Sequence, residues 1–105
     1  MYLFNLDKKV ALITGGNGGI GYAMARAMGD AGANIIIAGR NKDKNTLSVD
    51  KLKNSNIEAM AIEVDVDEEL SCQNMINQVV DKHQRIDILV NNAGTNIRKG
   101  LRNIH

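Results

Sequence analysis

Apolar and polar positions follow two different periodicities, which alternate along the chain. Short runs that are mostly apolar and end at glycine, asparagine or charged residues predict buried strands. These runs are residues 10–14, 35–38, 59–64 and 86–90. The run at 35–38 (IIIA) contains no polar residue, as is typical of a strand that is covered on both faces.

Between the predicted strands, apolar residues recur at every third and fourth position, which predicts three helices. The first begins at residue 20 and ends before Gly32, because glycine tolerates the left-handed conformation that ends a helix. The second, at 43–54, is polar, and the third runs to His83, which we expect at the surface. The residues expected to face the core are Ile20, Ala23, Met24, Ala27, Met28, Ala31, Leu47, Leu52, Cys72, Met75, Ile76, Val79 and Val80.

Strands that alternate with helices at this spacing predict an α/β fold with a parallel sheet, in the order β-α-β-α-β-α-β. Right-handed crossovers give the strand order 3-2-1-4. This is the N-terminal half of a Rossmann-like doubly wound parallel sheet, the half that binds nucleotides, with one strand beyond the switch point. We expect residues 1–105 to form this single partial domain, since no linker, repeat or proline divides the chain.

The composition excludes several other classes of protein. Hydrophobic residues make up 44% and charged residues 24% of the chain, as in soluble globular domains. A net charge of +1 with mixed signs argues against binding to nucleic acid or to an anionic membrane. No apolar run approaches the roughly 20 residues that cross a bilayer. The single cysteine and the lack of a secretory signal predict a cytoplasmic protein, and neither histidine has partners at metal-binding spacing.

The motif TGGNGGIG, residues 14–21, follows the first predicted strand and opens the first predicted helix. Glycines at such a junction allow a tight turn, a close approach to a pyrophosphate and close packing of helix on strand. The free N–H groups of the helix start favour an anion. A glycine-rich stretch can also be only a turn, but this position favours a dinucleotide.

Three motifs in order resemble the short-chain dehydrogenase/reductase family. TGGNGGIG fits that family's Thr-Gly-x-x-x-Gly-x-Gly pattern, EVDVD (63–67) resembles its acidic stretch after the third strand, and NNAG (91–94) resembles its signature after the fourth. The segments FNLDKKVALITGG and NNAGTNIRK are most similar to members that act on sugar acids such as gluconate. The resemblance implies NAD(P) as the cofactor and hydride transfer between it and a carbonyl or alcohol.

The resemblance also implies roles for individual residues. Asp65 would accept a hydrogen bond from the adenine amino group, with the backbone of Val66 beside it, and Asn91 would brace the sheet. The residues that would line the pyrophosphate are Gly15, Asn17, Gly18, Gly19 and Ile20. Those that would pass under the adenosine ribose are Asn92, Ala93 and Gly94. Alternatively, Asp65 caps the following helix, and the two asparagines are turn residues only.

Arg40 lies about 20 residues after the glycine motif, where NAD enzymes usually carry an acidic residue for the ribose hydroxyls. A guanidinium instead suits a 2′-phosphate through charge-assisted hydrogen bonds, so we favour NADP over NAD. Against this, the glycine loop lacks the second basic residue found in many NADP-preferring relatives. The alternative is a solvated surface arginine.

The family's catalytic serine, Tyr-x-x-x-Lys pair and asparagine lie beyond the NNAG segment. The two tyrosines of this chain, Tyr2 and Tyr22, are followed four residues later by leucine and arginine, so no catalytic residue is assigned. We expect a truncated oxidoreductase that is inactive alone. Alternatives are a stand-alone nucleotide-binding or interaction module, or a chain whose catalytic half comes from a partner. We also expect self-association through the fourth strand, which would be an exposed sheet edge.

Overall fold

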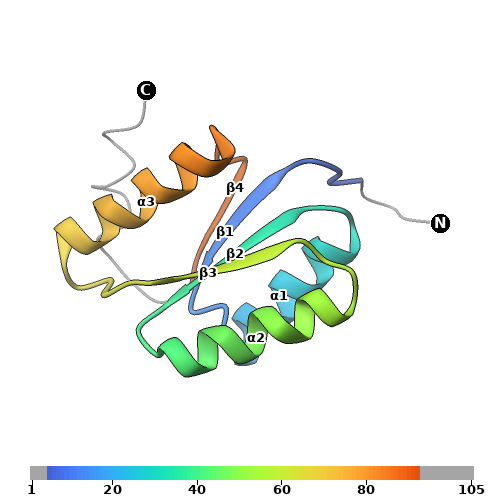
Figure 1. The fold of residues 1–105 in the computed structure, drawn as a ribbon, viewed down its shortest axis with the longest axis horizontal. Helices are drawn as coiled ribbons and strands as arrows, with labels where there is room; N and C mark the ends of the chain where they lie inside the picture. The colour runs from blue at the N-terminus through green and yellow to red at the C-terminus, as the bar shows by residue number, and fades with distance from the viewer. Residues whose placement is uncertain (1–4, 93–105) are drawn as a thin grey trace.

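The computed structural model of the chain describes residues 5–92, which form a parallel sheet with helices on both faces (Figure 1). Each of the first three strands is followed by a helix, as the alternating periodicities predict. The elements are β1 (Val10–Thr14), α1 (Gly19–Asp30), β2 (Asn34–Gly39), α2 (Lys42–Asn54), β3 (Ala59–Glu63), α3 (Glu69–His83) and β4 (Ile88–Asn91). The predicted order β-α-β-α-β-α-β is confirmed.

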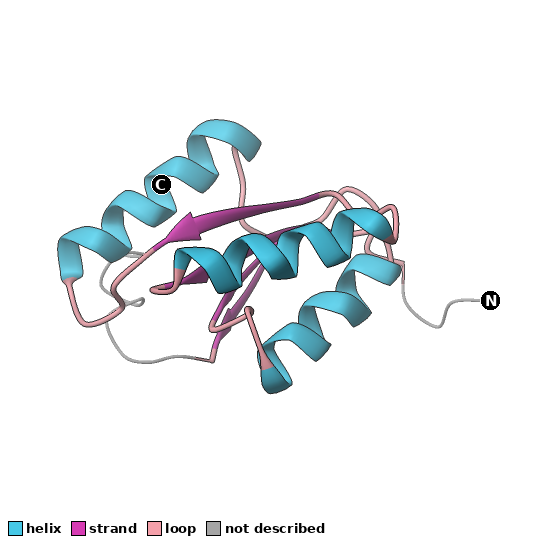
Figure 2. Ribbon diagram, turned by 60° about the horizontal axis from the view of Figure 1, so that its bottom comes forward, coloured by secondary structure: helices cyan, strands magenta, loops and turns pink. Residues whose placement is uncertain are grey.

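The sheet has the order β3-β2-β1-β4, and all neighbouring strands are parallel. Leu12 of β1 lies opposite Ile36 of β2 and Leu89 of β4. Helices α1 and α2 lie on one face of the sheet and α3 lies on the other, which Figures 1 and 2 show from two directions. The predicted order 3-2-1-4 and the α/β class are confirmed.

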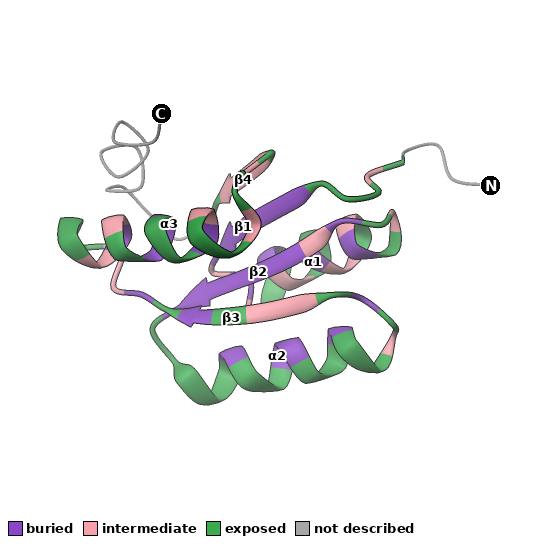
Figure 3. Cartoon of the chain, turned by 45° about the horizontal axis from the view of Figure 1, so that its top comes forward, coloured by how far each residue is buried: buried purple, intermediate pink, exposed green. Residues whose placement is uncertain are grey.

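Two hydrophobic clusters fill the space between the sheet and the helices, because successive residues of a strand point to opposite faces. In β1, Val10 and Leu12 belong to the cluster under α3, whereas Ala11 and Ile13 belong to the cluster under α1 and α2. The central strands β1 and β2 are buried almost throughout, and the outer strands are half-buried (Figure 3). The apolar run at 35–38 is therefore covered on both faces, as predicted.

The side of α1 that faces the sheet differs from the prediction. Its buried residues are Gly21, Ala25 and Gly29, whereas Ile20 is 73% exposed and Met24 is 40% exposed. Small residues on the inner side let the helix backbone pack closely on the sheet, which bulky side chains would prevent. The predicted buried stripe is therefore wrong for four residues that the structure exposes, namely Ile20, Ala23, Met24 and Ala27.

Helix α2 also buries a different set of residues. Leu52 is buried as predicted, but Leu47 is 60% exposed. Two polar residues, Asn45 and Ser48, take part in the buried face instead. In α3 the prediction is right, and the buried residues are Cys72, Met75, Ile76 and Val79.

Strand β4 begins at Ile88, two residues later than the apolar run indicates. Asp87 precedes it and pairs with the first residue of β1. The Val10 N–H donates to Asp87 Oδ2 at 2.8 Å, and the Asp87 N–H donates to the Val10 carbonyl at 2.9 Å. The hydrogen bonds from Arg85, and next the one from Val10, lower the pKa of Asp87 below its ordinary value. This carboxylate fixes the start of β1 against β4.

Candidate functional site

The glycine motif forms the turn between β1 and α1 at the carboxyl end of the sheet. Gly15 has a φ of 69°, a conformation that favours glycine, and its N–H donates to the Ala38 carbonyl at 2.8 Å. Helix α1 starts at Gly19, with neither a side-chain cap nor an acidic residue in its first turn. The first N–H groups of an α-helix have no acceptor within the helix. With no side chain to satisfy them here, they favour an anion.

Gly21 packs directly against the loop. A Cβ at this position would lie 2.2 Å from the Gly15 carbonyl oxygen and 3.0 Å from Asn92 Nδ2. The first distance is far shorter than a Cβ tolerates, so only glycine lets α1 begin so close to β1. The short distance to Asn92 Nδ2 shows that this side chain lies beside the glycine motif.

Thr14 and Asn91 connect the glycine motif to the segment after β4. They lie directly opposite each other, and Thr14 Oγ1 is 3.2 Å from Asn91 Oδ1 and 3.4 Å from the Val90 carbonyl. Asn91 is the last residue of β4, so it is a strand residue rather than a turn residue. This position agrees with the bracing role that the resemblance implies for it.

An open hollow of about 340 Å³ lies at the carboxyl ends of the strands, where sheets of this kind bind their ligands. The glycine loop, the end of β2, the start of α2 and the segment after β3 all contribute to it. Its lining includes Gly15, Asn17, Gly39, Arg40, Lys44 and Val66. Arg40 also lines a neighbouring hollow of about 260 Å³ together with Asp65. The structure thus brings the glycine motif, Arg40 and the acidic stretch at 63–67 together at one end of the sheet.

Arg40 and Asp65 form an ion pair, with 3.3 Å between Nη2 and Oδ2. The arginine side chain is 72% exposed and the aspartate side chain 34% exposed. Asp65 Oδ1 also accepts a hydrogen bond from the Asp67 N–H at 3.0 Å. The N-cap of α3 is Glu68, so the alternative in which Asp65 caps that helix is wrong. The two residues that were expected to contact different parts of a cofactor therefore contact each other.

Asn45 was not identified from the sequence. Its side chain is buried, and it contacts both the end of the sheet and Asn17 of the glycine loop. The signal available in the sequence was an asparagine inside a helix, where this residue is unfavourable unless its amide has partners. Gly39, at the end of β2, was also missed as a residue of the hollow.

The other predicted site residues are on the surface or beyond the described region. Gly18, Gly19 and Ile20 are exposed at the start of α1. Ala93 and Gly94 lie outside the described residues. For Gly18, Gly19 and Ile20 the structure gives a position but no contact that assigns a role.

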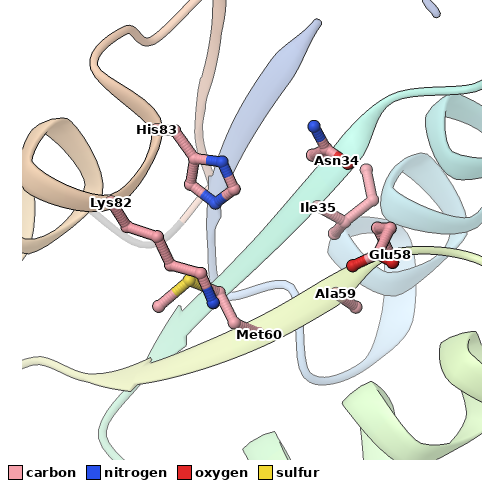
Figure 4. A pocket seen from close by; sticks show the side chains of 7 residues that line it. All are labelled: Asn34, Ile35, Glu58, Ala59, Met60, Lys82 and His83. Atoms are coloured by element: carbon pink, nitrogen blue, oxygen red, sulfur yellow. The ribbon is translucent and has the colours of Figure 1, made fainter. Parts of the chain in front are cut away.

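Another hollow lies at the amino ends of the strands, where β2 and β3 begin and α3 ends (Figure 4). Lys82 and His83 reach it from α3, and Glu58 reaches it from the segment before β3. Its volume is about 30 Å³, which holds about one water molecule. It is too small for a nucleotide and lies at the wrong end of the strands.

Cys72 is a free and buried cysteine, as its place on the helical stripe predicts. Burial, and next the negative charge of Asp65, raises the pKa of its thiol, so the reactive thiolate is disfavoured. Among residues 5–92 no cluster of histidine, cysteine, aspartate or glutamate could hold a metal ion. In the same region no helix has the length and apolar character needed to span a membrane.

Comparison with known proteins gives consistent results. The chain is 39% identical over 93 residues to meso-2,3-butanediol dehydrogenase of Serratia marcescens, covering 87% of this chain and 36% of that protein. It is 36% identical over 93 residues to 2-dehydro-3-deoxy-D-gluconate 5-dehydrogenase of Formosa agariphila, covering 88% and 35%. The structure of a metagenomic short-chain oxidoreductase in complex with NADP superimposes with a TM-score of 0.81 at 31% identity, covering 85% and 40%.

The chain spans little more than a third of the length of these relatives. The family model that matches it is that of the short chain dehydrogenases, and the match covers residues 9–105, which is most of the chain. The three motifs identified in the sequence fall within this range. The chain belongs to the short-chain dehydrogenase family.

Proposed function

We propose that this chain binds the adenosine and pyrophosphate portion of NADP(H) for a short-chain oxidoreductase. The observation that carries the proposal is that the glycine loop and Arg40 line one hollow at the carboxyl ends of the strands, and that the loop leads directly into the uncapped start of α1. The helix start suits the pyrophosphate, because its N–H groups and dipole attract an anion. The solved relative that holds NADP supports this choice of ligand.

The proposed contacts are those that the resemblance implies, and the place of Gly15, Asn17 and Val66 in the lining of the hollow supports them. The pyrophosphate would lie on the loop, and the adenine beside Asp65 and Val66. The ribose would lie over the segment after β4. The residues assigned to the pyrophosphate are Gly15, Asn17, Gly18, Gly19 and Ile20. Those assigned to the ribose are Asn92, Ala93 and Gly94.

Arg40 carries the proposed preference for NADP over NAD. Its guanidinium is 72% exposed at the rim of the hollow, and its ion pair with Asp65 is a partly exposed contact of 3.3 Å. Exposed ion pairs contribute only about 0–1 kcal/mol, so a 2′-phosphate can replace the carboxylate as the partner of Arg40. Released in this way, Asp65 can accept the hydrogen bond from the adenine amino group.

When bound, NADP(H) supplies or accepts a hydride in the family's reaction. The residues of this chain would hold and orient the cofactor, and no catalytic residue is assigned among them. We propose that the residues for that step belong to a part of the family fold outside these 105 residues, and that this chain alone is inactive. The gluconate 5-dehydrogenase relative supports a sugar acid as the substrate class.

The test is calorimetric titration of the purified chain with 2′,5′-ADP and with 5′-AMP. We expect 2′,5′-ADP to bind about tenfold more tightly, since a hydrogen bond to a charged group contributes about 1.5–3 kcal/mol and exposure reduces it. Arg40→Ala should abolish the difference. The matched control is Lys82→Ala, which also removes one positive charge but at the amino ends of the strands. This variant should keep the difference in affinity between the two nucleotides.

The outcomes of this titration separate two claims. Equal affinities for the two nucleotides in the unmodified chain would exclude the role of Arg40 but leave nucleotide binding intact. Binding of neither nucleotide would exclude the dinucleotide site itself and would favour the interaction module.

A second proposal concerns self-association. Among the described residues β4 is paired with one strand only, β1, so no described strand covers the other side of Ile88, Leu89 and Val90. Its side chains Ile88, Leu89 and Val90 are only half-buried. An apolar edge of this kind favours pairing with another chain. We propose that copies of this chain associate along β4.

A further inference from the structure

Asn45 connects three separate parts of the hollow through one buried amide. Its side chain is 2% exposed. Nδ2 donates to the Gly39 carbonyl at 2.9 Å and lies 3.5 Å from the Ile62 carbonyl, at the ends of β2 and β3. Oδ1 accepts a hydrogen bond from Asn17 Nδ2 at 2.9 Å. The amide therefore ties two strand ends to the glycine loop.

These contacts fix the direction of both amides. The carbonyls of Gly39 and Ile62 can only accept, so the nitrogen of Asn45 must face them. Its oxygen must then face the loop, and Asn17 must present its nitrogen to that oxygen. In the opposite orientation of Asn17, two oxygens would meet. Within residues 5–92 the oxygen of Asn17 has no hydrogen-bond partner of its own, and Asn17 lines the hollow.

Gly39 provides independent support for this bridge. A Cβ at Gly39 would lie 2.7 Å from Asn17 Nδ2 and 2.8 Å from Asn45 Oδ1, the two atoms that form the hydrogen bond. The bridge therefore passes directly over the end of β2, and it needs a residue without a side chain there. Arg40, the residue after Gly39, lines the same hollow.

We propose that Asn45 is a positioning residue that makes Asn17 a hydrogen-bond acceptor toward the ligand. The group that binds beside Asn17 must then be a donor, such as a ribose hydroxyl, and not a phosphate oxygen, which can only accept. This inference rests on the proposed function, and it replaces the pyrophosphate role assigned to the Asn17 side chain. The backbone of the loop remains free to bind the pyrophosphate.

The test compares 5′-AMP with 2′,3′-dideoxy-AMP, which lacks both ribose hydroxyls but has the same base and phosphate. In the unmodified chain we expect 5′-AMP to bind about threefold to tenfold more tightly, the usual worth of one hydrogen bond. Asn45→Leu and Asn17→Ala should each reduce the ratio to near one, and the double variant should show no further loss. Ser48→Ala, a buried polar position on the same helix outside the bridge, should keep the ratio.

Asn45→Asp separates positioning from stability. The carboxylate can still accept from Asn17 but cannot donate to the two strand carbonyls. We expect this variant to unfold at a lower urea concentration and yet keep the preference for 5′-AMP. A merely structural role predicts instead that the preference falls with stability in Asn45→Asp and Asn45→Leu alike. If Asn45→Leu does not fold, Asn17→Ala on the loop and Asn45→Asp still decide the question.

The outcomes distinguish failure of the proposed function from failure of this inference alone. Binding of neither nucleotide by the unmodified chain would exclude the nucleotide site and this inference with it. Equal binding of both nucleotides would retain the site but overturn the assignment of Asn17 as an acceptor. Unchanged discrimination in a folded Asn45→Leu variant would overturn the role of Asn45.

Discussion

Replacing Gly21 by alanine tests whether a backbone contact sets the start of α1. The added Cβ would lie 2.2 Å from the Gly15 carbonyl oxygen, a backbone atom that cannot turn away as a side chain can. We take the upper end of the overpacking range, about 3 kcal/mol. Alanine recovers about 1 kcal/mol as the better helix former. The expected net loss of about 2 kcal/mol lowers the urea midpoint by about 1 M.

Two other glycines provide matched controls in the same region. The three atoms nearest to a Cβ at Gly29, on the same buried side of α1, all belong to the buried Ile57 side chain, the closest at 2.6 and 2.9 Å. Because a side chain can shift further than a backbone carbonyl, the loss for Gly29→Ala should stay below the roughly 2 kcal/mol expected for Gly21→Ala. A Cβ at Gly18 would meet nothing within 4 Å, and its extended backbone suits any residue. Gly18→Ala should therefore be neutral or stabilising by up to about 1 kcal/mol.

Urea unfolding followed by far-UV circular dichroism measures the stability of the three variants and so ranks them. The contact also positions the glycine loop, so Gly21→Ala should weaken 5′-AMP binding under conditions where the variant is folded. An equal loss of stability for Gly21→Ala and Gly29→Ala would refute the argument that a backbone neighbour is costlier than a side-chain neighbour.

Three further predictions follow from the fold. The pKa of Asp87 is lowered in the folded chain, so its contribution to stability is present at neutral pH and is lost as pH falls below the ordinary carboxyl pKa of about 4. The difference in urea midpoint between the unmodified chain and Asp87→Asn should therefore be largest at neutral pH and should shrink as the pH falls below about 4; a difference that does not change with pH would contradict a role for the charge of Asp87. Sedimentation at increasing concentration should show assemblies that Ile88→Lys weakens, and a monomer at all concentrations would argue against pairing along β4. Purified chain, verified free of longer enzyme, should show no cofactor-dependent turnover of a carbonyl or sugar substrate, and stoichiometric turnover would contradict this.

The order of the elements and of the strands could be predicted from the sequence because both depend on local patterns. Residues 35–38 are apolar throughout, and they form a central strand covered on both faces. The 3-2-1-4 order then follows from right-handed crossovers between parallel strands. The start of β4 was predicted two residues too early, because Ile86 and Asp87 fit the strand pattern locally. Only the pairing of Asp87 with Val10 shows that the carboxylate lies before the strand.

The inner side of α1 could not be predicted from hydrophobic periodicity. Periodicity selects the side with the largest apolar side chains, which would place Ile20 and Met24 inside. The helix instead packs through Gly21, Ala25 and Gly29, which a hydrophobicity scale ranks as only weakly apolar. How closely a helix packs on a sheet depends on the volume of the side chains between them. The space available for those side chains is set by the sheet surface and cannot be read from the helix sequence alone. The glycine motif contained part of this information, since close packing of helix on strand is one of the uses of glycine at such a junction.

The motifs located the site, but they did not show how its residues act on one another. Arg40 and Asp65 lie 25 residues apart, and their ion pair exists because β2 and β3 are parallel neighbours whose carboxyl ends meet. Considered singly, Arg40 attracts a 2′-phosphate and Asp65 attracts an adenine amino group. Considered together, each side chain is the charge partner of the other, so the proposed preference for NADP depends on both. Asp65→Asn should therefore strengthen binding of 2′,5′-ADP through a freer Arg40 while removing the charge that accepts from adenine. If that variant instead lost affinity for 2′,5′-ADP and 5′-AMP equally, the adenine contact would dominate and the ion pair would have no part in selecting the cofactor.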